Sequence, residues 1–356
     1  MIPAFRHHDS NTATEDLPIR ELFYNVWVFI RKKVKRIFVM KILRMIVIIL
    51  IFVALFSARA EAEKRIEILM FSGLARYLET TRGFTDAIKD AGFGEDQTII
   101  TIENADANKA KAAELVQHLN ARHVDLIFAV GTHAALAVTQ KIKDIPVVFA
   151  QVYDPVYAGI VRNLESSGNN TTGASTKLPM SKLMDSLKRF KPVKRLGVLY
   201  TPGETNSEAQ LKDLQDIQTS YGIKMIPAPL TRVEDISLLL PLVIGSVDAL
   251  YVTGSNLVNS QLPHIVDLAN QARQVTITHL EDLVEQGVLI GVVPSSYLNG
   301  RLAGEKAVKI FLGDQPSSIP TETPKQFDII LNLKTAKTGG FQIPPDFMKA
   351  VKRTIE

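Results

Sequence analysis

The sequence has no cysteine among its 356 residues, which excludes disulfide bonds, thiolate metal ligands and a cysteine-linked lipid. Such a chain must rely on a hydrophobic core for its stability. Its hydrophobic content of 46% and charged content of 22% are those of an ordinary globular protein.

The apolar run at residues 45–56 is too short to span a bilayer, which takes about 20 apolar residues. Basic residues precede this run, and small-x-small sites at 58–60 and 60–62 follow it, which is typical of a secretory signal peptide. We therefore expect residues 40–62 to be a signal peptide. The remainder is then periplasmic and, without cysteine, not lipidated.

The segment before the signal has two interpretations. Either residues 1–39 come from an over-long gene prediction and Met40 is the true start, or they are a cytoplasmic tail. The alternative to cleavage is a retained anchor that includes the region around Trp27. In each case the chain after residue 62 faces the outside of a membrane.

The chain also has only a small excess of positive over negative residues. Lys and Arg number 41 and Asp and Glu 37, which gives a net charge of +4. Four of the positive residues lie in residues 31–35, so the exported part is nearly neutral. We therefore expect no nucleic-acid partner.

Enzyme motifs are missing as well. Gly168 and Gly173 have the glycine spacing of a phosphate-binding loop, but Ala174 stands at the lysine position. The sequence has no G-x-S-x-G motif, and its seven histidines show no H-E-x-x-H spacing. The sequence thus predicts no catalytic residue, metal or cofactor.

What the chain does contain is an alternation of short β-branched runs with helical patterns. The first set predicts strands at 65–71, 98–102, 125–130, 146–150 and 171–175 and helices at 76–91, 108–122 and 132–141. The second set predicts strands at 193–200, 224–228, 248–253, 274–278, 288–293 and 326–333 and helices at 207–221, 233–244, 261–273 and 297–312. The pattern indicates two α/β units, each a parallel sheet flanked by helices.

Ligands of such sheets bind outside the carboxyl ends of the strands, so residues at these ends are candidates. Thr132 and His133 begin a helix after Gly131, and the free N–H groups of a first helical turn attract a carboxylate or phosphate. Ordinary helix capping by Thr132 and a surface position for His133 are the alternatives.

A carboxylate follows the next strand. Asp154 precedes Pro155, which disfavours the helical region for Asp154 and holds it at the strand end. There it could bind an ammonium group by a charge-assisted hydrogen bond, and a solvated turn is the alternative. In the second unit Asn206, Thr253 and Asn256 occupy comparable polar strand ends, where helix capping is again the alternative.

Several segments together resemble one family, the ABC-transporter substrate-binding proteins that include tryptophan and aromatic amino-acid binders. The resemblance rests on Asp154-Pro-Val, the segments 168–173 and 193–200, Asn206-Ser207, 299–304, Ile319-Pro, 327–336 and 343–345. It covers residues 65–350.

The resemblance implies a two-lobed type I periplasmic-binding-protein fold. Lobe 1 would hold residues 65–173 and 294–325, and lobe 2 residues 174–293 and 326–356. It also implies that Thr132 and its neighbours bind the carboxylate of an amino acid. Asp154 would bind the ammonium group. Lobe-two contacts would come from Asn206, Thr253 and Asn256.

The main departure from the family lies after the first strand, at Ser72 to Tyr77, where relatives often carry an acidic or histidine-containing segment. Ser72 is a further candidate contact. Arg76 would suit an acidic ligand or could simply lie on the first helix.

The function implied is capture of a small polar solute, an amino acid, by hinge closure and its delivery to an ABC permease in the inner membrane. The protein would act as a monomer. The alternative is a ligand-sensing module for a membrane signalling protein. An exported hydrolase or isomerase that uses Asp154, His279 and Glu281 is a third hypothesis, against which the missing nucleophile motif counts.

Overall fold

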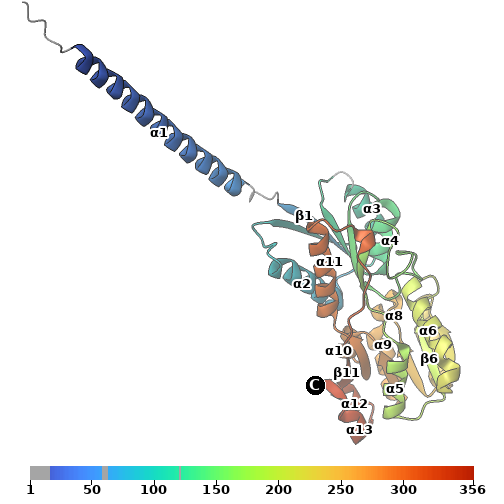
Figure 1. Ribbon diagram of the computed structural model, residues 1–356. Coiled ribbons are helices and arrows are strands. Elements are labelled where there is room, and N and C mark those ends of the chain that lie inside the picture. Colours follow the sequence, from blue (N-terminus) through green and yellow to red (C-terminus); the bar gives the residue numbers. More distant parts are fainter. Residues whose placement is uncertain (1–16, 58–62, 120–121) are drawn as a thin grey trace, which may run out of the picture. The chain divides into compact units, whose positions relative to one another are not determined.

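The computed structural model describes residues 17–57, 63–119 and 122–356 of the protein. The chain divides into two compact units, Met1–Ala62 and Glu63–Glu356. In the first unit, helix α1 (Leu17–Ser57) contains both the basic flank and the apolar run (Figure 1). The expected cleavage sites at residues 58–62 lie outside the described residues. Within the described ranges, no helix is both long and apolar enough to cross a membrane.

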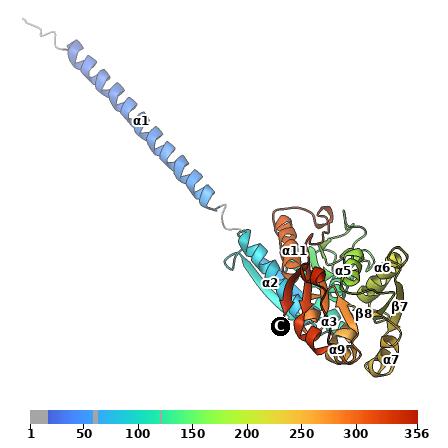
Figure 2. The ribbon, with the colours of Figure 1, turned by 90° about the horizontal axis from the view of Figure 1, so that it is seen from below.

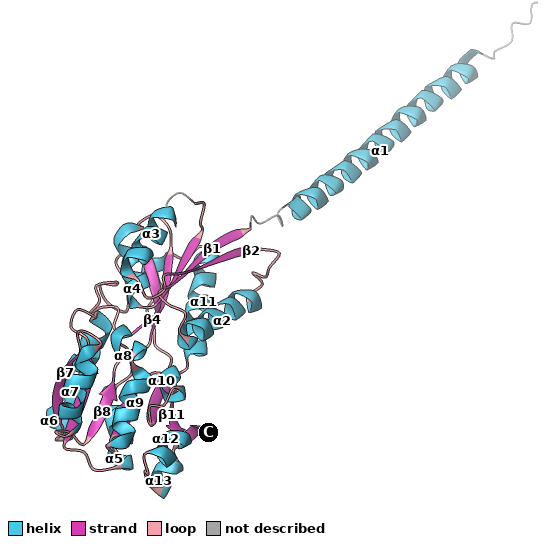
Figure 3. Ribbon diagram, turned by 180° about the vertical axis from the view of Figure 1, so that it is seen from behind, coloured by secondary structure: helices cyan, strands magenta, loops and turns pink. Residues whose placement is uncertain are grey.

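The second unit has two lobes, each built on one sheet. The first lobe carries a five-stranded sheet in the order β2-β1-β3-β4-β5, all parallel (Figure 3). Its strands are β1 (Lys64–Met70), β2 (Thr98–Asn104), β3 (Leu126–Val130), β4 (Val147–Val152) and β5 (Thr171–Ser175). Strands β3 and β4 are buried along their whole length, because helices cover both faces of the sheet.

Four helices cover this sheet. They are α2 (Ala75–Asp90), α3 (Lys109–Leu119), α4 (Thr132–Lys141) and α11 (Ser296–Phe311). Helices α2 and α11 pack together on one face, and α3 and α4 pack together on the other. Helix α11 follows the second set of strands in the sequence, so the chain returns to the first lobe before it ends.

The second lobe carries a seven-stranded sheet in the order β12-β11-β10-β9-β8-β6-β7. Its strands are β6 (Arg195–Tyr200), β7 (Lys224–Pro229), β8 (Ala249–Val252), β9 (Val275–Thr278), β10 (Ile290–Pro294), β11 (Phe327–Asn332) and β12 (Val351–Ile355). Strand β11 runs antiparallel to β10, and the other pairs are parallel. The prediction of a parallel sheet therefore holds except at this one junction, where the chain comes back from the first lobe.

The helices of the second lobe range from long to single-turn elements. They are α5 (Met180–Phe190), α6 (Thr205–Tyr221), α7 (Glu234–Ile244), α8 (Asn256–Ser260), α9 (Leu262–Gln271), α10 (Glu281–Glu285), α12 (Leu333–Thr338) and α13 (Pro345–Met348), with a 3₁₀ turn η1 (Pro316–Ser318) in the returning segment. Figure 2 shows α6 and α7 beside β7 at the sheet edge.

The strands and the longer helices predicted from the sequence are confirmed to within a few residues. Helix α5, the single-turn helices and strand β12 were not predicted.

A bulge interrupts the pairing of β4 with β5 between Phe149 and Val152. Gln151 has a positive φ of 55° there, a conformation uncommon for a residue with a side chain. Asn299 of α11 stabilises this turn, because its Oδ1 accepts a hydrogen bond from the Gln151 N–H at 3.0 Å while its Nδ2 donates to the Ser175 carbonyl at 2.9 Å. A bulge of this kind re-aims the side chains that follow it.

Helices α2 and α11 approach so closely that only glycine fits at their contact. A Cβ atom at Gly300 would overlap the carbonyl oxygen of Thr80, and one at Gly83 would overlap that of Tyr297. Thr80 also donates a hydrogen bond to the Ser296 carbonyl at 3.1 Å, which links the two helices directly.

We predict that Gly300→Ala lowers the free energy of unfolding by about 1–3 kcal/mol or more, because the methyl group forces the two backbones apart. Gly245→Ala is the matched control, since residue 245 has a helical φ of −65° and its Cβ would lie 3.6 Å from the nearest atom. Urea unfolding measures both. Equal stability of the two variants would contradict the close-contact explanation.

Candidate functional site

The candidate site is a cavity between the two lobes at the carboxyl ends of their strands. First-lobe residues line it from the segments after β1, β3, β4 and β5, and second-lobe residues from those after β6, β8 and β9. The lining residues are Arg76, Tyr77, Thr132, His133, Gln151, Tyr153, Thr176, Asn206, Gln210, Gly254, Asn256, His279 and Leu280. Its volume of about 30 Å³ accommodates roughly two water molecules.

The start of α4 forms the first-lobe wall. Gly131 has a φ of 98°, and the Tyr77 hydroxyl lies so close that a Cβ at residue 131 would come within 2.6 Å of it. Within the described residues no side chain caps this helix end, and Thr132 is buried. The first-turn N–H groups are therefore available for an anionic group.

His133 lies beside this helix start and stacks on Phe71, with ring centroids 4.6 Å apart. Burial, together with the positive charge of Lys109, lowers the pKa of His133 to about 4. The imidazole is therefore neutral at physiological pH and adds no charge to the wall.

Asn206 and Gln210 form the second-lobe wall from one face of α6, one helical turn apart. The Asn206 Nδ2 donates to the Gly254 carbonyl at 2.7 Å, and the Gln210 Oε1 accepts from the Gly254 N–H at 3.1 Å. The Asn206 Oδ1 is buried and has no hydrogen-bond partner within the described part of the chain. It is thus an acceptor available to a ligand. Asn256 is held by Glu204, which accepts from its N–H at 2.8 Å.

His279 lies at the end of β9, where its Nδ1 is 2.7 Å from the Tyr251 hydroxyl. The ring of Tyr153 meets it edge-on, with centroids 5.2 Å apart. Burial, with a further contribution from the nearby charge of Arg76, lowers the pKa of His279 to about 3. This histidine is therefore also neutral.

Arg76 enters the cavity from the first turn of α2. Its Nη1 donates to the Oδ2 of Asp282, on α10 of the second lobe, at 2.5 Å. Burial disfavours the charged form, but Asp282 outweighs burial and raises the pKa of Arg76. Its guanidinium group also lies over the Tyr77 ring, 5.2 Å from the centroid.

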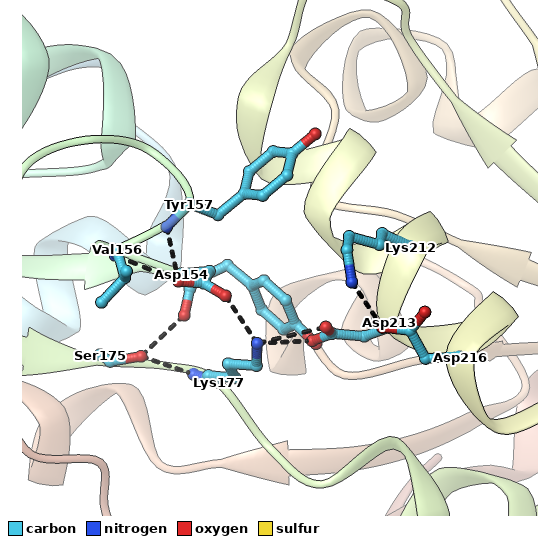
Figure 4. Close-up of polar contacts among 9 residues, drawn as sticks. Asp154, Val156, Tyr157, Ser175, Lys177, Lys212, Asp213 and Asp216 are labelled. Carbon is cyan, nitrogen blue, oxygen red and sulfur yellow. Dashed lines mark hydrogen bonds and ion pairs between the residues drawn. The ribbon is translucent and has the colours of Figure 1, made fainter. Parts of the chain in front are cut away.

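Asp154 is not among the lining residues. Its Oδ1 accepts from the backbone N–H groups of Val156 and Tyr157, and its Oδ2 accepts from Lys177 at 2.6 Å (Figure 4). Burial alone would raise the pKa of Asp154, but these hydrogen bonds hold it below its usual value. The carboxylate predicted to bind the ligand ammonium group is thus occupied by its own turn and by Lys177.

Lys177 also pairs with Asp213 of α6 at 3.0 Å, and the Tyr153 hydroxyl donates to the same carboxylate at 2.8 Å. Figure 4 shows Lys177 between the two aspartates. Because Asp154 belongs to the segment after β4 and Asp213 to the second lobe, this cluster connects the lobes beside the cavity.

Two other predicted contacts also lie outside the lining. Thr253 is fully buried, and its hydroxyl donates to the Leu199 carbonyl of β6 at 2.6 Å. Ser72 is buried, and its hydroxyl has no partner within the described residues. Of the seven predicted contacts, the structure therefore brings together Thr132, His133, Asn206 and Asn256.

Sequence reasoning missed most of the remaining lining residues, although several carry a recognisable signal. Gln151 and Thr176 each lie at or just after the end of a strand, the same signal that found Thr132. The sequence analysis names His279 for the hydrolase hypothesis, and the structure places it in this lining. Gln210 lies four residues after Asn206 on a helix and therefore shares its face. Tyr153 is one residue from Asp154, and the bulge in β4 decides which of the two side chains lines the cavity.

Two lobes with a polar cavity between the carboxyl ends of their strands define a solute-binding protein. The sequence model of the family "ABC transporter substrate binding protein" matches residues 66–355, so the chain belongs to this family. It is therefore an extracytoplasmic protein that captures a solute for an ABC importer, and not an enzyme.

Several known proteins are similar to this chain. A tyrosine-binding protein of Clostridioides difficile (strain R20291) is 30% identical over 274 residues, 76% of this chain and 79% of the relative. The crystal structure of an ABC domain in complex with L-Trp from Streptococcus pneumonia has a TM-score of 0.78 at 26% identity, and the match covers 83% of this chain and all of that one. The ligand-free, open structure of a substrate-binding protein with adhesive properties from Clostridium difficile has a TM-score of 0.67 at 30% identity, covering 82% of this chain and all of that one.

We predict that His279 makes the protein less stable as the pH falls. Its folded-state pKa of about 3 lies below the usual 6.5, so the unfolded chain binds a proton that the folded chain rejects. The free energy of unfolding should therefore fall as the pH drops from about 6.5 toward 3, by up to about 1.4 kcal/mol per pH unit from this group.

Urea unfolding at pH 7, 6 and 5 tests this dependence by comparing the wild type with His279→Gln. The free energy of unfolding of the variant should depend less steeply on pH, by the uptake of about one proton. His118→Gln, which replaces an exposed histidine on α3, should keep the wild-type slope. Identical slopes in all three proteins would show that His279 is not the buried neutral group described here.

We predict that Lys177→Met lowers the free energy of unfolding by about 1 kcal/mol, because two largely buried carboxylates lose their shared cation while the lysine itself is partly exposed. Lys212→Met is the matched control in the same region: Lys212 pairs with Asp216 on the exposed surface of α6. We expect no measurable change in this control. If both variants lower the unfolding temperature equally, the explanation that Lys177 neutralises two largely buried carboxylates is wrong.

Proposed function

We propose that the solute is an amino acid, bound between the two lobes as a zwitterion. The observation that carries this proposal is the cavity itself, where the described residues leave N–H groups unpaired on one wall and an amide oxygen unpaired on the other. The Tyr- and Trp-binding relatives support the same solute class.

Each end of the zwitterion has a chemically suitable wall. The carboxylate would bind the first-turn N–H groups of α4 at Thr132 and His133, where the helix dipole favours negative charge. The ammonium group would donate to the Oδ1 of Asn206, an assignment that replaces Asp154 because Lys177 already occupies that carboxylate. Asn256 lies on the same wall as Asn206.

Closure of two lobes is the proposed mechanism of capture. Lobe 1 would consist of residues 65–173 and 294–325, and lobe 2 of residues 174–293 and 326–356, so that the chain crosses between them three times. A ligand that contacts both lobes stabilises the closed state by its differential affinity for that state.

Two observations support assigning the present conformation to the closed state. Ion pairs connect the lobes. The TM-score is also higher to the L-Trp complex than to the ligand-free, open structure, although the sequence identity is lower.

We propose a periplasmic location for this monomer, reached through a signal peptide at residues 40–62 and maintained without a lipid anchor. The absence of cysteine supports the missing lipid. The partner would be the permease of an ABC importer in the inner membrane. Family membership does not favour the alternative of a sensor for a membrane signalling protein.

A calorimetric screen of the purified protein against the twenty amino acids tests the function. We expect micromolar or tighter binding of at least one amino acid, together with a smaller radius of gyration in X-ray scattering when it is bound. If none of the twenty amino acids binds, the proposed solute class is wrong. Binding without any change in scattering would overturn hinge closure.

We predict that Asn206→Ala weakens amino-acid binding by about 1.5–3 kcal/mol, the usual loss of a hydrogen bond to a charged group. Asn259→Ala is the control, because Asn259 also has a buried unpaired amide but does not line the cavity. Unchanged calorimetric affinity of Asn206→Ala would remove Asn206 from the site.

A further inference from the structure

The feature that leads beyond the proposed function is the ion pair between Arg76 and Asp282. The two side chains come from opposite lobes, and only 4% and 3% of their surfaces are exposed. Arg76 lines both the binding cavity and a second cavity of about 380 Å³, which Asp282 also lines. The pair therefore forms part of the wall between these two spaces.

The binding cavity has no net charge of its own. Of the described residues that line it, Arg76 alone is charged at neutral pH, because both His133 and His279 have pKa values far below 7. Asp282 cancels the charge of Arg76 at a distance of 2.5 Å. The rest of the lining consists of hydroxyl, amide, aromatic and aliphatic groups.

The residues around Asp282 provide no cation other than Arg76 in the described structure. The adjacent carboxylate, Glu281, pairs with Arg353 at 2.6 Å, so Arg353 already has its own anion. The second oxygen of Asp282 is buried and has no partner within the described residues. Arg76 is thus the one cation that Asp282 contacts in the described structure.

We propose that the Arg76–Asp282 pair makes the site selective for amino acids with uncharged side chains. An acidic side chain could reach Arg76 only by displacing Asp282, which would leave a buried carboxylate without a counter-charge, a costly arrangement. A basic side chain would meet the positive Arg76, whose anion is already taken. This inference rests on the proposed function, since it specifies the solute class of the same site.

The proposal reverses the interpretation that Arg76 suits an acidic ligand. The sequence shows the arginine but not its partner, which is 206 positions away. Because the pair connects the lobes, it also couples charge selection to closure: a ligand that breaks the pair removes a contact of the closed state.

Calorimetry with paired ligands of the same shape tests the proposal. The probes are L-glutamate with L-glutamine, and L-4-carboxyphenylalanine with L-4-carbamoylphenylalanine. The wild type should bind the amide of at least one pair at least tenfold more tightly than the acid. Asp282→Asn, which leaves Arg76 uncompensated, should shift this ratio at least tenfold toward the acid.

Two further variants separate charge from structure. Glu281→Gln removes the neighbouring carboxylate and should keep the wild-type ratio. The double variant Arg76→Gln/Asp282→Asn should regain the preference for the amide. If Asp282→Asn does not fold, Arg76→Gln provides the reciprocal test, in which the ratio of L-lysine to L-norleucine affinity should rise at least tenfold.

A wild-type protein that binds acid and amide equally, or an Asp282→Asn variant that keeps the wild-type ratio, would overturn the inference while the proposed amino-acid receptor stands. A wild type that binds neither these probes nor any of the twenty amino acids would overturn both.

Discussion

The interactions on which the rest of this structure depends are the charged contacts between its two lobes. Arg76 reaches Asp282 at one place, and Lys177 lies between Asp154 and Asp213 at another. The Arg76–Asp282 pair is buried, so it is stronger than a surface ion pair but costly to leave incomplete, whereas Lys177 is partly exposed to water. Such contacts favour one relative arrangement of the lobes and penalise intermediate ones. A protein that captures a solute between two lobes needs such a preference.

Most of the fold could be predicted from the sequence, because alternating strands and amphipathic helices leave a clear pattern along the chain. Helix α5 was missed although its buried residues Leu183, Leu187 and Phe190 lie at three- and four-residue spacing, so the sequence did carry a helical signal. The other elements that were not predicted have physical reasons. Helices α8, α10 and α13 have five residues or fewer, too short for a helical period. Strand β12 carries two adjacent basic residues and pairs with β11 across an irregular register.

The sequence could predict a cavity-lining residue only where its position in the chain alone determines that it lines the cavity. Thr132 and Asn206 lie at the start of the helices that follow β3 and β6, and topology brings strand ends together at one edge. Asp154 has the same position, but its carboxylate accepts hydrogen bonds from its own turn and from Lys177. Gln151 lines the cavity because of a bulge that no sequence period announces. The pairing of Arg76 with Asp282 likewise depends on the tertiary structure and cannot be read from the sequence.

The contact of α2 with α11 has a consequence for how the protein is made. Thr80 and Gly300 meet across more than two hundred residues of intervening chain, and α11 covers the same face of the first sheet as α2. A growing polypeptide that ends before residue 296 therefore lacks one of the two helices that cover this face of the first sheet. Contacts so distant in sequence are slow to form. The packing of the first lobe is thus completed only after most of the second lobe has been synthesised.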